Sequence, residues 1–196
     1  STELDPNDAR LTEIILEQSQ RINTIVENVL QLGRQEHGQD LSFVLKPWLE
    51  GFMKEFHQSQ PDSEGAIRID VEPPELAIHF DPGHLHQLLY NLCQNGLRHA
   101  AASDDQIKLQ LNAAMIGDDH GYLDVIDAGP GIAEEHRTHV FEPFFTTEPK
   151  GTGLGLYLAR ELAARNQAQL RYEPTARKES RFRLLFRAGK GVTNQP

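Results

Sequence analysis

The sequence predicts an α+β domain preceded by one long helix. Stretches with helical periodicity alternate with short strand-like stretches, and neighbouring strands are close enough in the chain to form hairpins. The first part of the chain carries instead an apolar heptad pattern, which is typical of a bundle or coiled-coil helix. We therefore expect a helical segment over 1–38, a folded domain over 39–188 and a flexible tail over 189–196.

The leading helix is predicted from a seam with alternating steps of four and three residues. All seam positions except Gln18 are apolar: Leu11, Ile15, Gln18, Ile22, Ile25, Val29 and Leu32. Asp5 and Pro6 supply a capping residue and a proline at the first helical position. Such a helix either packs on the following domain or meets other helices. We favour a dimeric bundle, because an exposed seam promotes aggregation.

The elements of the folded domain follow from the same patterns. Helices are expected over 47–57, from Asp81 to about Ala102, and over 153–166. The expected strands are 66–71, 76–80, 107–115, 122–126, 170–172 and 182–186. The stretch 127–152 is rich in loop residues and separates the fourth strand from the last helix.

Composition and charge exclude several classes of protein. The net charge is −10, and no basic residues cluster along the sequence, which argues against binding to nucleic acid or anionic lipid. A single cysteine, Cys93, excludes an intrachain disulfide and a cysteine-based zinc site. No apolar run approaches the roughly 20 residues of a membrane span. Because the chain begins at Ser1 rather than Met, we expect a piece of a longer protein.

Polar residues gather on one face of the predicted helix after Asp81. Asn91, Asn95 and Arg98 share that face, and His99 follows directly. Amide oxygens are hard ligands that suit Mg²⁺, and a guanidinium suits phosphate. An ordinary exposed face is the alternative interpretation.

Two glycine-containing motifs follow. Asp127 ends an apolar strand, where its carboxylate can accept a hydrogen bond from an exocyclic amine, and Gly129 and Gly131 let a ligand approach the backbone. A solvated turn explains the same residues. The second motif is Gly-Thr-Gly-Leu-Gly at 151–155, whose glycines open a helix and present free N–H groups to an anion.

The loop before the second motif is rich in phenylalanine. Phe141, Phe144 and Phe145 lie between Gly131 and Gly151, where we expect them to anchor an otherwise mobile lid. The alternative is that these aromatic side chains belong simply to the core.

The order of these motifs resembles the N, G1, F and G2 boxes of sensor histidine kinases. They are Asn-Leu-x-x-Asn-x-x-Arg-His, Asp-x-Gly-x-Gly, Phe-x-Pro-Phe-Phe and Gly-Thr-Gly-Leu-Gly-Leu, and the likeness covers about 40–188. The leading helix resembles the second helix of that family's dimerisation and phosphotransfer hairpin. The residues within these motifs are most similar to those of the nitrogen-regulator and pilus-sensor (PilS-like) branch.

The resemblance implies a Bergerat-type two-layer sandwich with a mixed, mostly antiparallel sheet, binding ATP and Mg²⁺ beneath a lid. It implies Asn95 as the Mg²⁺ ligand, with Asn91 in support, and Asp127 as the group that recognises adenine. The full set of implied ATP-binding residues is Asn91, Asn95, Arg98, His99, Asp127, Gly129, Gly131, Ile132, Phe141, Phe144, Phe145, Thr146, Thr147, Lys150, Gly151, Thr152, Gly153, Leu154, Gly155 and Leu156.

The phosphoacceptor of the family is expected upstream of Ser1. None of the nine histidines lies in the His-Glu-x-Arg/Lys-x-Pro context that the family uses, so this chain should bind ATP without phosphorylating itself. The resemblance implies a homodimer through the leading helix and the missing hairpin helix. Its implied partner is a response regulator, of the kind that activates sigma-54 promoters. It also implies a cytoplasmic domain of a protein anchored in the inner membrane through upstream segments.

Two other interpretations remain. One is a degenerate, non-catalytic module for dimerisation or scaffolding. The other is a different ATPase of the same superfamily, of the chaperone, topoisomerase, mismatch-repair or anti-sigma type. The heptad helix and the phenylalanine box favour the histidine kinase.

Overall fold

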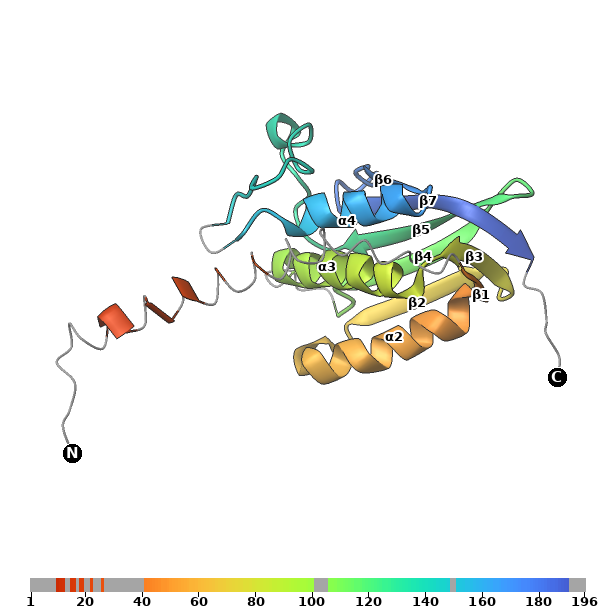
Figure 1. Cartoon of the computed structure of the whole chain (residues 1–196), viewed down its shortest axis with the longest axis horizontal. Helices are drawn as coiled ribbons and strands as arrows, with labels where there is room; N and C mark the ends of the chain where they lie inside the picture. Colours follow the sequence, from red (N-terminus) through yellow and green to blue (C-terminus); the bar gives the residue numbers. More distant parts are fainter. Residues whose placement is uncertain are drawn as a thin grey trace.

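The computed structural model describes residues 41–100, 106–148 and 151–190, together with 10–12, 15, 16, 18, 19, 22 and 26 of the leading segment. The elements are β1 (Leu41–Val44), α2 (Leu45–Ser59), η1 (Pro61–Ser63), β2 (Ile67–Glu72), β3 (Leu76–Phe80), α3 (Pro82–Ala100), β4 (Leu109–Ile116), β5 (His120–Asp127), η2 (Glu134–His136), α4 (Gly155–Arg165), β6 (Gln169–Tyr172) and β7 (Ser180–Lys190). They form two layers, with α2, α3 and α4 side by side on one face of the sheet (Figure 1). The predicted α+β sandwich is confirmed.

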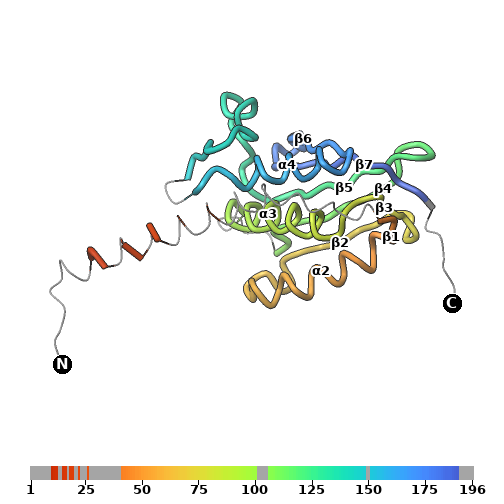
Figure 2. Tube along the Cα trace, viewed as in Figure 1, coloured from red at the N-terminus to blue at the C-terminus, as the bar shows by residue number. Residues whose placement is uncertain are grey.

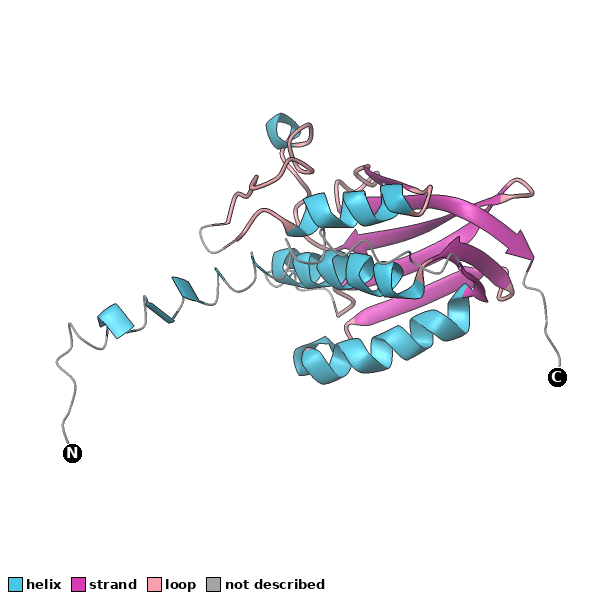
Figure 3. Cartoon of the chain, in the orientation of Figure 1, coloured by secondary structure: helices cyan, strands magenta, loops and turns pink. Residues whose placement is uncertain are grey.

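The sheet is mostly antiparallel, as expected. Its strand order is β1-β3-β7-β5-β4-β2. The remaining strand, β6, pairs with residues 182–185 of β7, whereas β3 pairs with residues 188–190 of β7. Among the described ladders only β2 and β4 run parallel, because β3 and α3 provide the long crossover that a parallel pair requires. Figure 3 shows this arrangement, with the strands forming one layer and the helices the other.

Alternation along the strands decides which face of the sheet is buried. On β4 and β5 the side chains of Leu111 and Leu123 are fully buried against the helices. Their neighbours Asn112 and Asp124, which are partners in the ladder, point to the opposite face. The core therefore lies between the sheet and the three helices, and the outer face of the sheet is polar.

Two strands differ from the prediction. Strand β1 was not predicted, since no element was assigned to residues 41–44, yet Leu41 to Val44 pair with Phe80 to Ala77 of β3. Strand β7 was expected over 182–186, yet it begins at Ser180 and continues to Lys190, pairing successively with β5 and β3. Its ladder with β3 includes Gly189 and Lys190, which were assigned to the flexible tail; residues 191–196 lie outside the described part of the chain.

The segment between β5 and α4 projects from one end of the sandwich (Figure 2). That end also carries the carboxyl end of α3 and the amino end of α4. The four predicted motifs therefore come to the same end of the domain. An asparagine at the opposite end holds the two helices together.

This asparagine, Asn166, follows α4 and contacts the start of α3. Its Oδ1 accepts a hydrogen bond from the Asp81 backbone N–H at 2.8 Å, and its Nδ2 lies 2.7 Å from the Leu162 carbonyl oxygen and 3.0 Å from His84 Nδ1. Asp81 in turn accepts a hydrogen bond from the His84 N–H at 2.7 Å, which is the N-cap geometry predicted for this helix.

Replacing Asn166 by alanine should lower the free energy of unfolding by about 1–3 kcal/mol, because it leaves part-buried donors and acceptors unpaired. Urea denaturation followed by circular dichroism measures the change. Asn112→Ala, on the polar outer face of the sheet, is the matched control and should change stability by less than about 0.5 kcal/mol. Equal losses in the two variants would contradict a connecting role for Asn166.

The described residues of the leading segment are helical, and its apolar side chains are exposed: Leu11, Ile15, Leu16, Ile22 and Val26. Much of the predicted seam, including Ile25, Val29 and Leu32, lies outside the described residues. Within the described part of the chain, no helix combines the length and apolar character needed to cross a bilayer.

Candidate functional site

A cavity of about 910 Å³ opens at the end of the domain where the motifs meet. The last turns of α3, the end of β5, the start of β7 and the first turn of α4 form its walls. Residues 131–148 and 151–153 of the projecting segment cover one side, and we call these residues the lid. The volume lies within the range of sites that hold a small molecule or cofactor.

Most of the predicted site residues line this cavity. They are Asn91, Asn95, Arg98, His99, Asp127, Gly131, Ile132, Phe145, Thr146, Thr147, Gly151, Thr152, Gly153, Gly155 and Leu156. Gly129, Phe141, Phe144 and Leu154 lie near it without lining it, and Lys150 lies outside the described residues.

The wall formed by α3 carries the amides. Asn91, Asn95 and Arg98 lie on successive turns of one face, with the asparagines half-buried and Arg98 exposed at the rim. Asn91 Oδ1 lies 3.4 Å from the Gln87 side-chain nitrogen. Asn91 Nδ2 is buried and has no hydrogen-bond partner among the described residues. A buried amide with unused hydrogen-bonding capacity indicates that this wall is built to receive a polar ligand.

Asp127 lies at the bottom of the cavity and is only 3% exposed. Its Oδ1 accepts a hydrogen bond from the Gly129 N–H at 2.9 Å. Burial raises the pKa of this carboxyl above its ordinary value, although hydrogen bonds from Gly129 and Ser180 and the nearby His99 act in the opposite direction. The site thus holds a desolvated carboxylate, an acceptor that gains strongly from a new donor.

The turn after Asp127 fixes the start of the lid. Gly131 has φ of 74°, and a Cβ there would overlap the carbonyl oxygen of Lys178, so only glycine fits. Both backbone groups of the next residue, Ile132, are hydrogen-bonded to side chains. Its N–H donates to Tyr172 Oη at 2.9 Å, and its carbonyl accepts from Arg137 Nε at 3.0 Å.

The Gly151–Gly155 loop joins the other end of the lid to α4. Gly153 has φ of 69°, and its carbonyl accepts a hydrogen bond from the Phe144 N–H at 2.9 Å. Helix α4 begins at Gly155 and has no side-chain N-cap. The N–H groups of its first turn therefore remain available beside the cavity, which Gly155 and Leu156 line.

The three phenylalanines behave differently from one another. Phe141 packs edge-on against Phe182, with the ring centroids 6.1 Å apart, and Phe145 lies near the rings of His136 and His139. Phe144 is 66% exposed, so the expectation that it anchors the lid is wrong. Its φ of 66° turns the side chain outward while its backbone bonds to Gly153.

Sequence reasoning missed several residues of the cavity wall. Ser180 and Phe182 enter it because β7 pairs antiparallel with β5, which places Ser180 opposite Asp127. Gln94 belongs to the same α3 face as Asn91, and helical periodicity could have identified it. His136 and Glu148 come from the lid, whose path carries no periodic signal.

One protein family matches the part of the chain that carries the cavity. Residues 80–190 match the family model described as "Histidine kinase-, DNA gyrase B-, and HSP90-like ATPase". That range runs from the end of β3 to the end of β7 and contains every motif that lines the cavity.

Individual relatives are sensor kinases. The chain is 41% identical over 187 residues to the sensor protein kinase PilS of Pseudomonas aeruginosa, covering 95% of this chain and 35% of PilS. It is 30% identical over 177 residues to the sensory histidine kinase/phosphatase NtrB of Escherichia coli O157:H7, covering 86% of this chain and 49% of NtrB. The chain thus spans about a third to a half of these relatives.

A solved structure shares the fold. The crystal structure of full-length ShkA in complex with AMPPNP superposes with a TM-score of 0.67 at 23% identity, covering 97% of this chain and 41% of that one.

Proposed function

Because the chain belongs to the family of histidine kinase-, DNA gyrase B- and HSP90-like ATPases and contains the ATPase domain of a sensor histidine kinase, we propose that its cavity binds ATP together with Mg²⁺. One observation carries the proposal: amides, a buried carboxylate and a glycine loop from separate motifs line a single cavity. Each group suits a different part of the nucleotide.

The amide wall fits a magnesium ion bound to phosphate. Asn95 would supply a side-chain oxygen, and Asn91, whose buried amide N–H is unpaired, would support it by donating a hydrogen bond to a phosphate oxygen. Mg²⁺ favours oxygen ligands and usually keeps several waters, so one protein amide together with phosphate oxygens is a sufficient set. When bound, the ion neutralises charge on the phosphates.

The glycine loop and the start of α4 fit the triphosphate. N–H groups of an uncapped first turn, together with the positive end of the helix dipole, favour an anion at this position. Arg98 and His99 approach from α3 and would contact the phosphates. Phosphoryl transfer depends mainly on such positioning and charge neutralisation.

The buried carboxylate of Asp127 fits adenine. It is an acceptor deep in the cavity, and adenine presents an exocyclic amine where guanine presents a carbonyl. A carboxylate would attract the first and repel the second, so the site should discriminate between ATP and GTP.

The whole protein would act as a protein-histidine kinase. We propose that this domain donates the ATP γ-phosphate to a histidine on an upstream helix of the longer protein. The phosphoryl group then passes to a response regulator of the kind that activates sigma-54 promoters. The relatives' names, sensor kinase and sensory histidine kinase, support this proposal. The exposed apolar side chains of the leading segment support a homodimer. We further propose that the chain is a cytoplasmic domain of an inner-membrane protein.

Calorimetric titration of the chain with a non-hydrolysable ATP analogue tests the proposal. We expect micromolar affinity that depends on Mg²⁺, with GTP binding at least about tenfold more weakly. A folded chain that binds neither nucleotide would favour the scaffold interpretation. A chain restored with its upstream helix should then form phosphohistidine from radiolabelled ATP.

Replacing Asp127 by asparagine should weaken ATP binding by about tenfold or more, because the adenine amine loses a charged acceptor. The affinity for inorganic tripolyphosphate, which has no base, should change by less than about twofold. Competition titrations with the two ligands measure both effects. Equal losses for the two ligands would show that Asp127 does not recognise the base.

The same substitution should stabilise the ligand-free protein at neutral pH. The folded-state pKa of Asp127 is raised by burial above 3.8, so the folded state binds more protons than the unfolded state over the interval between the two values. Wild-type stability therefore falls as the pH rises through that interval, whereas the neutral asparagine escapes this loss. We expect a higher Tm for the variant at pH 7, with the difference narrowing as the pH approaches 3.8.

A further inference from the structure

A second cleft, of about 510 Å³, lies on the other side of the lid base. It is bounded by α4, by β6 and by Arg137 and Phe141 of the lid. Arg160 and Arg171 complete its basic wall, so we call it the arginine cleft. None of its lining residues belongs to the wall of the proposed ATP site.

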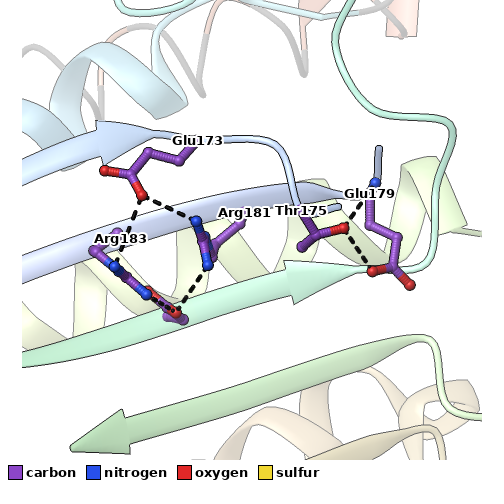
Figure 4. A network of polar contacts seen from close by, with 6 residues as sticks. Glu173, Thr175, Glu179, Arg181 and Arg183 are labelled. Carbon is purple, nitrogen blue, oxygen red and sulfur yellow. Dashed lines mark hydrogen bonds and ion pairs between the residues drawn. The ribbon is translucent and has the colours of Figure 1, made fainter. Parts of the chain in front are cut away.

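The positive charge of this cleft is not neutralised by the described residues around it. Its only described lining carboxylate, Glu173, is bound to Arg181 at 3.0 Å and lies 3.8 Å from Arg183, as Figure 4 shows. Arg183 is itself paired through two bonds of 2.7 Å with the buried Asp124. The ion pairs on the outer face of the sheet therefore occupy Glu173 and leave the cleft without a counter-charge.

The three arginines of the cleft have uncharged partners. Arg137 Nε donates to the Ile132 carbonyl at 3.0 Å, and Arg171 donates to Gln169 Oε1 at 2.6 Å. The Arg160 guanidinium lies over the Phe141 ring, 5.3 Å from its centroid. Within 41–100, 106–148 and 151–190, none of the three forms an ion pair with a carboxylate.

This basic character is local. Residues 160–190 contain nine lysines and arginines and three glutamates, a net charge of +6 within a chain of net charge −10. This excess corrects the expectation that no basic residues cluster along the sequence. The arginines of the cleft come from separate elements, including the lid. Folding brings them together on one surface.

The cleft also contains a free strand edge. In the described sheet β6 pairs only with β7, and the Glu173 N–H donates to the Arg181 carbonyl at 2.8 Å. In an antiparallel ladder such bonded positions alternate, so Leu170 and Tyr172 direct their backbone N–H and C=O groups away from β7. Both residues line the cleft.

We propose that the arginine cleft docks an extended acidic segment of a partner protein. The segment pairs with the free edge of β6 through the backbone groups of Leu170 and Tyr172, and its carboxylates bind Arg160 and Arg171. A free edge selects an extended peptide rather than a small anion, and uncompensated arginines select carboxylates. The docked segment contacts the lid base through Arg137 and Phe141. The residues that line this site do not line the proposed nucleotide cavity, although Arg137 and Tyr172 both bond to Ile132 of that cavity.

The test uses a fluorescein-labelled peptide of sequence Glu-Val-Glu-Thr-Glu-Val-Glu. The whole chain is titrated into this peptide, and the fluorescence anisotropy of the label measures binding. We expect saturable binding with a Kd below about 1 mM. A peptide with glutamine in place of every glutamate, and one with alternate backbone nitrogens methylated, should each bind at least about tenfold more weakly. The first control removes the charge, and the second removes the strand pairing.

Two matched variants locate the site. Arg171→Glu should weaken peptide binding by about tenfold or more, whereas Arg187→Glu, the same change at an exposed position of β7 outside the cleft, should change it by less than about twofold. ATP affinity should be unchanged in both variants. Peptide and ATP are titrated in separate experiments. A failure of the docking proposal can therefore be distinguished from a failure of the ATP-binding proposal.

Four results would overturn the docking site: no saturable binding of the acidic peptide, equal binding of the glutamine peptide, equal effects of the two variants, or displacement of the peptide by inorganic phosphate at equal concentration. The last result would indicate a simple anion site. Thermal denaturation of each variant verifies that it is folded.

Discussion

Replacing Asn95 by alanine is expected to lower the affinity for Mg²⁺–ATP by about a hundredfold while leaving Mg²⁺-free ATP binding nearly unchanged. Asn95 lies on the cavity wall one helical turn after Asn91, and it is half-buried rather than part of the apolar core. Truncation removes the proposed oxygen ligand without opening a cavity among the leucines of α3. Calorimetric titrations with ATP in excess Mg²⁺ and in EDTA measure the two affinities.

The control for this variant is Asn112→Ala, which makes the same chemical change on β4 at the outer face of the sheet. It should leave both affinities within about twofold of the wild type. If Asn95→Ala binds Mg²⁺–ATP as tightly as the wild type, Asn95 is not the metal ligand. Asn91, the second amide on the same cavity wall, then becomes the residue to substitute.

The helices and most strands could be predicted because their signals are local. Asp81 caps α3 through the His84 N–H, and the leucines of that helix recur at helical spacing. Strand β1 gives no such signal, since four residues are too few to show alternation and its partner β3 lies beyond α2. The ends of β7 were missed because its pairing with β5 and β3, rather than its own hydrophobicity, extends it.

Residues of the candidate site also divide into those that local sequence predicts and those that depend on long-range pairing. The amide face of α3 and the two glycine motifs are each readable from residues a few positions apart. Ser180 and Phe182 join the cavity only through the register of β7 against β5, which joins residues distant in the chain. The outward direction of Phe144 depends on a positive φ and on its bond to Gly153, and composition does not encode either.

Replacing Gly153 by alanine is expected to weaken ATP binding by about tenfold to a hundredfold, since it strains the junction between the lid and α4. Gly153 has φ of 69°, and an added Cβ would meet the Cα of Phe144 at 2.7 Å. The three nearest atoms, the C, Cα and O of Phe144, are all backbone atoms, so relief requires that the lid moves away from α4. Because Gly153 lines the cavity, that movement displaces the groups proposed to hold the triphosphate.

Gly155→Ala separates backbone strain from simple proximity to the ligand. Gly155 lines the same cavity, but an added Cβ there meets nothing within 4 Å, and the residue begins a helix that alanine favours. We expect its ATP affinity to stay within about threefold of the wild type, as measured by calorimetry beside Gly153→Ala. Comparable losses of ATP affinity in both variants would mean that the loop needs open space beside the phosphates rather than the left-handed backbone of Gly153. The junction between the lid and α4 would then have no special role in ATP binding.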